Sequence, residues 1–447
     1  MSLAQNRGFS SFYDKILAFI FIWGRIGGMK NIKLPELLAP AGTLDAFKTA
    51  ILYGADAIYA GLPGFSMRAR AKIDVEGVRQ GIELAHAAGK RVYLAFNLFA
   101  HDHEYANMPR VAEIIRYLKP DALIVSDPGI VMWVRENFPD MPIHISTQAN
   151  ICSAKTVKFW QNAGAKLCVL AREVSHSEFK NIRAECPDVG LEIFVHGAMC
   201  MSYSGRCLLS NFITGRPANR GACAQLCRWK YDVILREVET GVEMSIDEDA
   251  RGAYIMNSKD LCLMPRLADV VAAGPDSLKI EGRNRSEYYV GSVVNAYRCA
   301  LDAYAENPDN FDPAPFMDAL NRLETRGYTT AFFDGPVPPS AHNYETTRST
   351  SDYHAAGVIT AVDDKYITFE LRNETRIGDE ITFILPGTMD SVSVQLPKLI
   401  NAKNGEVVEK MAAGMGNSIL IPRTWLGDKY ADKFVPYVLA YKKKNRE

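Results

Sequence analysis

The sequence predicts an α/β chain, a TIM-type (β/α)8 barrel followed by a small C-terminal β-barrel domain. Eight apolar runs of strand length alternate with segments of helical period through the first two thirds of the chain. These runs are continuously apolar, as expected for parallel strands that are buried on both faces. After residue 305 the alternation stops, and short β-type runs separated by Gly, Asp and Asn take over.

The eight expected strands each precede a segment of helical period, except the seventh, which precedes a long irregular insert. The expected strands are Pro35–Ala39, Ala57–Gly61, Arg91–Phe99, Ala122–Ser126, Ile143–Thr147, Leu167–Ala171, Glu192–His196 and Ser277–Glu281. The expected helices are Leu44–Tyr53, Val75–Ala88, Val111–Leu118, Ile130–Asn137, Thr156–Ala163, Glu178–Glu185 and Glu287–Tyr304.

Glycine stands before several of the expected strands, at Gly54, Gly89, Gly164 and Gly274. Glycine is typical of the position that follows the end of a helix. No GxGxxG motif follows the first strand, which argues against a dinucleotide-binding open sheet. Eight βα units in about 270 residues therefore favour the closed barrel.

The same pattern divides the chain into regions. Residues 29–305 are expected to form the barrel, with a cysteine-rich insert at residues 197–262. Residues 306–350 are expected to be a helical segment and a Pro-rich linker, and residues 351–447 a β-barrel domain with a basic tail. Such a tail is usually solvated, and RNA contact is the alternative.

Residues 1–28 are expected to be a dispensable extension. The apolar run Ile16–Trp23 has eight residues, far short of the roughly 20 that span a membrane. Asp14 precedes it and no small-x-small cleavage site follows, which argues against a signal peptide. A clean domain start follows at Met29. An amphipathic interfacial segment is the alternative.

Composition limits the partners. The 51 basic and 52 acidic residues give a net charge of −1, so no global field draws the chain to DNA or to an anionic membrane. Any RNA binding must come from a local patch. Nine cysteines, an odd number in a large chain, do not resemble a secreted disulfide framework. We therefore expect a reducing, cytoplasmic location.

Five of the nine cysteines lie close together along the chain, around the ends of the seventh and eighth expected strands. They are Cys200, Cys207, Cys223, Cys227 and Cys262. Zinc is one reading, but no CxxC pair exists, although three residues separate Cys223 from Cys227. An iron–sulfur cluster tolerates irregular spacing, because each thiolate can come from a different loop. TIM barrels carry their chemistry at this end of the strands.

Several motifs resemble peptidase family U32, the collagenase-like proteins. They are EIFVHGAMCMSYSGRCLLS at Glu192–Ser210, LLAPAG near the start, NRGACAQLCRWKY, NSKDLC and SLKIEGR. The resemblance extends from residue 33 to about residue 440 and includes the C-terminal domain, which the shorter ubiquinone-hydroxylation members lack. Size and domain order are most similar to those of the bacterial prephenate-dependent tRNA uridine hydroxylases.

The resemblance implies an enzyme that hydroxylates the wobble uridine of tRNA to 5-hydroxyuridine without oxygen, with prephenate as the oxygen donor. Its partners would be tRNA and this small carboxylic acid. The resemblance also implies a 4Fe-4S cluster on four cysteines, which here would be Cys200, Cys207, Cys223 and Cys262. Cys227 could replace Cys223, and the sequence leaves both open.

Polar residues at the expected strand ends are candidates for this chemistry. A dianionic acid is best bound by Arg or Lys, and the candidates are Arg172, Lys279 and Arg283, of which the last two could instead meet RNA phosphates. The groups that could read a uracil edge are Asn97, Gln148 and His196. The groups that could move protons are His144, Glu173 and His196.

Two other classes of function remain open. Proteolysis is one, although the sequence has neither the HExxH motif of zinc peptidases nor the GxSxG motif of serine hydrolases. Cys200 and His196 could form a thiol–imidazole pair. A nucleophile leaves the other four clustered cysteines unexplained, whereas a metal cluster accounts for them together. The other class is an RNA-binding protein whose cluster is structural.

Overall fold

The structure is a computed structural model. It describes residues 32–63, 65, 73–200, 202–203, 206–216, 218, 222–229, 234–236, 243–245, 258–337, 339–341, 343 and 349–444. The expected extension over residues 1–28 lies outside them. Among the helices described, none is both long and apolar enough to cross a membrane.

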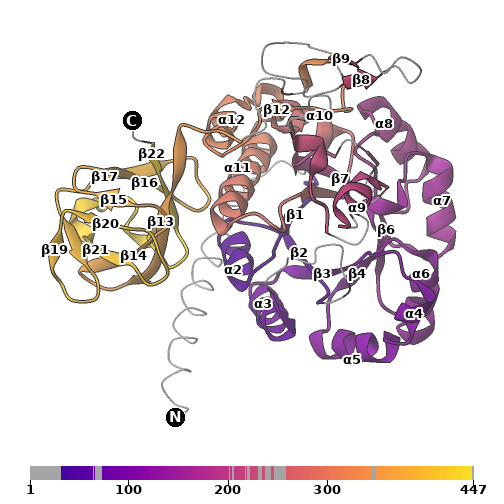
Figure 1. Cartoon of the computed structure of the whole chain (residues 1–447), viewed down its shortest axis with the longest axis horizontal. Helices are drawn as coiled ribbons and strands as arrows, with labels where there is room; N and C mark the ends of the chain where they lie inside the picture. Colours follow the sequence, from indigo (N-terminus) through magenta and orange to yellow (C-terminus); the bar gives the residue numbers. More distant parts are fainter. Residues whose placement is uncertain are drawn as a thin grey trace.

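Eight parallel strands form the predicted barrel (Figure 1). The hydrogen-bonded order is β11-β1-β2-β3-β4-β5-β6-β7, and β11 also pairs with β7, which closes the cylinder. The strands are β1 (Glu36–Pro40), β2 (Ala57–Gly61), β3 (Arg91–Phe96), β4 (Ala122–Val125), β5 (Ile143–Ile145), β6 (Leu167–Val169), β7 (Gly190–Gly197) and β11 (Ser277–Ile280).

Helices follow the strands and cover the outside of the barrel (Figure 1). They are α2 (Leu44–Leu52), α3 (Val75–Ala87), α4 (Asp102–Tyr105), α5 (Met108–Leu118), α6 (Pro128–Asn137), α7 (Ala154–Asn162), α8 (His176–Glu185), α10 (Leu267–Ala272) and α11 (Glu287–Glu306). Side chains of Thr43, Asp74 and Ser153 accept hydrogen bonds from the first turns of α2, α3 and α7. The four predicted helix-ending glycines all have positive φ.

Strands β3 and β6 are shorter than the sequence predicts. The third was expected to reach Phe99 and the sixth Ala171, but the regular strands end at Phe96 and Val169, and β5 likewise ends at Ile145 instead of Thr147. The apolar character of the segment continues past the last ladder hydrogen bond, because the chain remains buried as it turns over the rim. The carboxyl-terminal ends of the eight strands are called the barrel mouth below.

The cysteine-rich insert follows β7. Its described elements are α9 (Leu209–Thr214), the short strands β8 (Ile234–Arg236) and β9 (Glu243–Ser245), and β10 (Asp260–Cys262). β10 runs antiparallel to β7 and pairs Cys262 with His196. Beyond the barrel, helix α12 (Ala314–Leu320) and strand β12 (Tyr328–Thr329) follow. The helical segment predicted within residues 306–350 is therefore α12, which ends at Leu320.

The C-terminal region is a curled antiparallel sheet, with strand order β17-β16-β22-β13-β14-β21-β18-β19, accompanied by a small sheet of β15 and β20. The strands are β13 (Tyr353–Val362), β14 (Tyr366–Leu371), β15 (Thr375–Arg376), β16 (Glu380–Ile384), β17 (Ser391–Gln395), β18 (Leu399–Asn401), β19 (Val407–Val408), β20 (Lys410–Met411), β21 (Ser418–Pro422) and β22 (Leu439–Lys443). Two register shifts interrupt the pairing along β13.

The expected basic tail is partly strand. Lys442 lies on β22, is buried and forms an ion pair with Asp379. Lys444 pairs with Glu324 at 3.0 Å. Lys442 is therefore not a freely solvated charge, whereas Lys443 beside it is exposed, so the solvated basic tail stays a prediction. Residues 445–446 lie outside the described residues.

The C-terminal sheet docks against helices α2 and α11 (Figure 1). The buried Tyr53 hydroxyl, on the turn that ends α2, donates to the carbonyl of Ile384 at 2.8 Å and accepts from the backbone N–H of Leu439 at 2.9 Å. Asn295 of α11 accepts from the backbone N–H of Gly387 at 2.8 Å. One continuous apolar core therefore joins the two regions.

Candidate active site at the barrel mouth

Two glycines let the segment after β11 lie close to its neighbours. A Cβ on Gly42, in the loop after β1, would lie 2.0 Å from the carbonyl oxygen of Arg283. A Cβ on Gly197, at the end of β7, would lie 2.6 Å from the carbonyl oxygen of Glu281, and its φ is +120°. No side chain fits at either position. The LLAPAG and HGAMC motifs thus hold residues 281–283 over the mouth.

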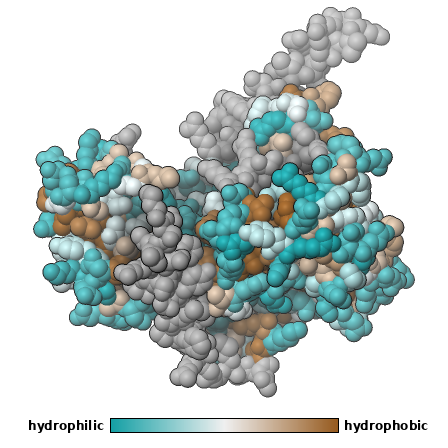
Figure 2. All heavy atoms as spheres, turned by 90° about the horizontal axis from the view of Figure 1, so that it is seen from below, coloured by the Kyte–Doolittle hydropathy of each residue, from teal (hydrophilic) through white to brown (hydrophobic). Residues whose placement is uncertain are grey.

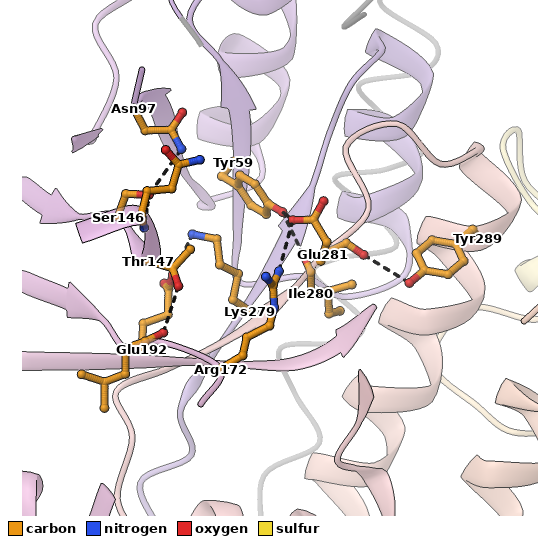
Figure 3. A network of polar contacts seen from close by, with 12 residues as sticks. Tyr59, Asn97, Ser146, Thr147, Arg172, Glu192, Lys279, Ile280, Glu281 and Tyr289 are labelled. Atoms are coloured by element: carbon orange, nitrogen blue, oxygen red, sulfur yellow. Dashed lines mark hydrogen bonds and ion pairs between the residues drawn. The ribbon is translucent and has the colours of Figure 1, made fainter. Parts of the chain in front are cut away.

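Glu281 is the centre of a polar cluster in this segment (Figure 3). Its carboxylate lies 3.5 Å from the hydroxyl of Tyr59 and 3.9 Å from the guanidinium of Arg172. Its backbone carbonyl accepts a hydrogen bond from Tyr289 at 3.2 Å. Arg172 also stacks over the ring of Phe194, with Cζ 4.0 Å from the ring centroid. An incoming anion can compete with the carboxylate of Glu281 for Arg172.

Arg283 lies beside the same cluster. The Arg283 side chain is buried, with its guanidinium carbon 5.6 Å from the centre of the Tyr59 ring. Arg172 contacts Glu281 and Arg283 lies over the ring of Tyr59, so both guanidinium groups border the Glu281–Tyr59 pair. This arrangement suits a ligand with two carboxylates or a phosphate.

Lys279 lies deeper in the barrel than the sequence suggests. Its ammonium forms a 2.7 Å ion pair with Glu192, and the two side chains are only 5% and 1% exposed. The other oxygen of Glu192 accepts from the hydroxyl of Ser277 at 2.9 Å. Lys279 is thus paired with an interior partner, but its ammonium also lies 4.5 Å from the centre of the Tyr59 ring, so its role as a ligand-binding cation stays a prediction.

Asn97 and Gln148 form the amide part of the site. Asn97, just past β3, donates to the hydroxyl of Ser146 at 3.3 Å, and the Ser146 hydroxyl also accepts from the backbone N–H of Gln148. Gln148 is buried, and its side-chain carbonyl oxygen has no hydrogen-bond partner within the described structure. A buried, unpaired amide oxygen costs about 1–3 kcal/mol, which a ligand N–H would recover.

His144 lies below this amide pair, inside the barrel. Its ring packs edge-on against Tyr93 at 4.6 Å, and burial, assisted by the charge of Lys279, lowers its pKa to about 3. An imidazole that stays neutral down to this pH is a poor base near neutrality. Glu173, next to Arg172, is half-buried, and burial raises the pKa of its carboxyl. Of the predicted proton carriers, Glu173 suits that role and His144 does not.

His196 lies outside the cluster. It packs between α11 and β12, where the rings of Tyr289, Tyr297 and Tyr328 lie 6.0, 5.7 and 5.3 Å from it. Burial lowers its pKa to about 3. Its prediction as a catalytic or uracil-reading residue is therefore not supported. A thiol–imidazole pair with the exposed Cys200 is not supported either, because this ring is enclosed by tyrosines.

The cysteines differ in their surroundings. Cys200 and Cys223 are exposed, and Cys207 and Cys227 are half-buried. Cys262 is buried, with its sulfur 3.9 Å from the hydroxyl of Tyr297, and burial raises the pKa of its thiol to about 11. These thiols suit an iron–sulfur cluster in number and type. They do not converge, however: nowhere in the described part of the chain do three His, Cys, Asp or Glu side chains gather as a metal site.

The structure thus brings together Asn97, Gln148, Arg172 and Arg283 at the mouth, with Glu173 beside them. The sequence reasoning missed two members of this group, Tyr59 and Glu281. Tyr59 is hidden within a strand of apolar residues. Glu281 directly follows β11 in the SLKIEGR motif. Residues at the carboxyl-terminal ends of the strands often form the active site in TIM barrels.

The comparisons with known proteins agree with the sequence motifs. Residues 42–343 match the family model described as peptidase family U32. The tRNA hydroxylation protein P of Escherichia coli is 38% identical over 430 residues, which cover 87% of this chain and 93% of that protein. The 23S rRNA 5-hydroxycytidine C2501 synthase of Escherichia coli is 31% identical, over 88% of this chain and 53% of that protein. The Collagenase of Porphyromonas gingivalis is 31% identical and covers 87% of this chain and 95% of that protein. On the match to the family model and the extent of these likenesses, the chain belongs to peptidase family U32.

Proposed function

We propose that this chain is a tRNA-modifying enzyme that hydroxylates the wobble uridine at C5. The observation that carries the proposal is the extended likeness to a protein named for tRNA hydroxylation. A second relative named for 5-hydroxycytidine synthesis supports hydroxylation of a pyrimidine ring. In this role the chain works in the cytoplasm, where its substrate is.

The mouth offers groups that suit a uracil ring. Uracil presents one N–H between two carbonyl oxygens. The unpaired amide oxygen of Gln148 can accept from that N–H, and the neighbouring Asn97 can meet a carbonyl once its contact to Ser146 is exchanged. Because both amides are buried, the site should select uracil over other bases: a base without the matching groups leaves the amides unpaired.

We further propose that prephenate supplies the oxygen and that Arg172 and Arg283 bind its two carboxylates. Both guanidinium groups lie close to aromatic rings, which favours a flat, partly desolvated binding site. On binding, a carboxylate displaces Glu281 from Arg172, and Glu173, with its raised pKa, can hold or release a proton beside the ligand.

The cofactor we propose is a 4Fe-4S cluster held by Cys200, Cys207, Cys262 and either Cys223 or Cys227. Such a cluster supplies one-electron chemistry when bound. The described cysteines do not converge on one point. Iron and acid-labile sulfide after anaerobic purification test it: about four of each per chain are expected, with loss in the alanine variants of the ligands. A folded wild-type chain that contains neither iron nor sulfide would exclude the cluster.

The enzymatic proposal is tested by nucleoside analysis of tRNA. Cells that lack their own uridine hydroxylase should regain 5-hydroxyuridine with the wild-type chain. Gln148→Leu should lower its formation at least about tenfold, since one buried hydrogen bond to the base is lost. Gln161→Leu, on the outer helix α7, is the matched control and should behave as wild type. No 5-hydroxyuridine with the wild-type chain would refute the proposal.

Peptidase activity is the alternative that one relative's name favours. The tyrosine cage around His196 argues against a cysteine-protease mechanism through Cys200. Release of peptides from gelatin by the purified chain, unaffected by Gln148→Leu, would favour the peptidase. If the chain binds tRNA but neither reaction occurs with prephenate present, the RNA-binding reading stands instead.

A further inference from the structure

The cysteine-rich insert carries an unusual density of exposed apolar side chains. Eleven large apolar residues are exposed in the described chain, and five of them fall in the short stretch between Cys200 and Trp229. They are Tyr203, Leu208, Phe212, Ile213 and Trp229. Elsewhere the described surface shows the usual pattern, with hydrophilic residues covering most of the face in Figure 2. Clustered exposed apolar side chains mark interaction sites.

The same stretch is strongly basic. Residues 200–230 contain five Arg or Lys residues and no Asp or Glu, within a chain whose net charge is −1. Among the described basic residues, Arg206 is exposed and places its guanidinium carbon 5.0 Å from the ring of Phe99. A polyanion is the partner that this charge favours.

The described part of the insert extends across the barrel mouth. It leaves the barrel from β7, whereas Phe99, which Arg206 contacts, follows β3 on the far side of the strand order. The pKa of Tyr203 is raised, chiefly by the nearness of Cys152 and also by Glu173, which follow β5 and β6. Tyr203 and Arg206 therefore border the mouth through which a substrate must reach Gln148 and Arg172.

Helix α9 is held in place rather than left loose. The buried hydroxyl of Ser210 donates to the carbonyl of Arg216 at 2.6 Å and accepts from the backbone N–H of Ala224 at 2.9 Å. Arg216 donates in turn to the carbonyl of Ala222 at 3.1 Å. These bonds tie α9 to the segment that carries Cys223 and leave Phe212, at 89% exposed, directed to solvent. An exposed ring on an anchored helix can stack on an unpaired base.

We propose that this surface, formed by Tyr203, Arg206, Phe212 and Trp229, binds single-stranded RNA by stacking unpaired bases beside the barrel mouth. Aromatic rings interleaved with arginine are the features that bind unpaired nucleotides, because every base offers a π face and every phosphate a charge. The surface would hold the nucleotides that flank the uridine entering the mouth. The inference thus rests on the proposed function and adds to it the element that grips the RNA, in place of the basic tail.

Binding of a fluorescently labelled RNA hairpin with uridines in its loop tests this surface, using the full chain and no prephenate. Phe212→Ala and Trp229→Ala should each weaken binding by about 5- to 150-fold, as expected for the loss of one stacked base. Phe212→Tyr should restore it. Phe159→Ala, an exposed phenylalanine on α7, is the matched control and should leave the affinity unchanged.

Charge is tested separately by the salt dependence of binding. Arg206→Gln should reduce the slope of log affinity against log salt by about 0.7, the value for one phosphate contact of a single strand. A blunt RNA duplex should bind weakly and be insensitive to Phe212→Ala.

Three results would overturn the inference. They are wild-type affinity in both alanine variants, an equal loss of affinity for duplex and loop RNA, and a dimer that Phe212→Ala converts to a monomer. The last would assign the surface to a second copy of this chain. Failure of the proposed function gives a different result. No 5-hydroxyuridine would form, while hairpin binding and its dependence on Phe212 would remain.

Discussion

Replacing Lys279 by methionine tests whether the interior ion pair is structural. The carboxylate of Glu192 is 1% exposed, and its 2.7 Å contact to Lys279 is the one that neutralises its charge. Without Lys279, only the hydroxyl of Ser277 still donates to this carboxylate among the contacts seen in the described barrel. Removing one partner of a buried pair typically costs about 3–5 kcal/mol.

The structure also sets a ceiling on this cost. Glu192 can escape by taking up a proton, and protonating a carboxyl of ordinary pKa, about 4.3, at pH 7 costs roughly 3.7 kcal/mol. We therefore expect Lys279→Met to lower the free energy of unfolding at pH 7 by about 3–4 kcal/mol. Because protonation of the unpaired carboxylate relieves this cost, the variant should be less destabilised at acidic pH than at pH 7.

Urea unfolding followed by circular dichroism, at several pH values, measures this. Glu192→Gln combined with Lys279→Met removes both charges and should recover most of the loss and its dependence on pH. A loss below about 1 kcal/mol for Lys279→Met at pH 7, with no dependence on pH, would refute the reasoning. Lys279 would then be free to bind a ligand, as the sequence first suggests.

Three further predictions concern other parts of the chain. Burial raises the pKa of Glu36 to about 7, so its folded state holds a proton that the unfolded chain releases above pH 4.5. Stability should therefore fall by about 3 kcal/mol from pH 4.5 to 7, and Glu36→Gln should flatten this slope in urea titrations; an unchanged slope would contradict the assignment. Gly197→Ala should cost at least about 1–3 kcal/mol and impair activity through the displaced Glu281, whereas unchanged melting and turnover would show that the close contact is dispensable. Tyr53→Phe strands the backbone groups of Ile384 and Leu439 and should cost about 2 kcal/mol in thermal unfolding, with wild-type stability as the contrary result.

The barrel could be predicted because its signals are local. Apolar runs, helical periods and helix-ending glycines each act within a few residues, and eight repetitions leave little choice of fold. Any residue just past the carboxyl-terminal end of a barrel strand must lie near the mouth. This placed Asn97, Gln148, Arg172 and Arg283 there from the sequence alone.

The errors have non-local causes. His196 was expected at the mouth, but the pairing of β11 with β7 shifts register between Lys279 and Ile280, which interrupts the alternation of side chains and turns the ring toward α11. No local pattern announces such a shift. The ion pair of Lys279 could not be predicted, because its partner Glu192 lies 87 residues away in the chain. His144 was misjudged because burial, which lowers its pKa, is a property of the assembled barrel.

Helix α11 has an outer face that is covered only when synthesis of the chain is nearly complete. Its inner face packs on the barrel, and at Gly291 its outer face lies so close to Leu439 that an added Cβ would be 2.4 Å from that side chain. Leu439 leaves the ribosome 148 residues after Gly291. At about 5–20 residues per second, the outer face waits roughly 7–30 s for its cover. A nascent or truncated chain without the last strand would therefore present an apolar helix to the cell, which makes it a client for chaperones and a target for proteolysis until synthesis ends.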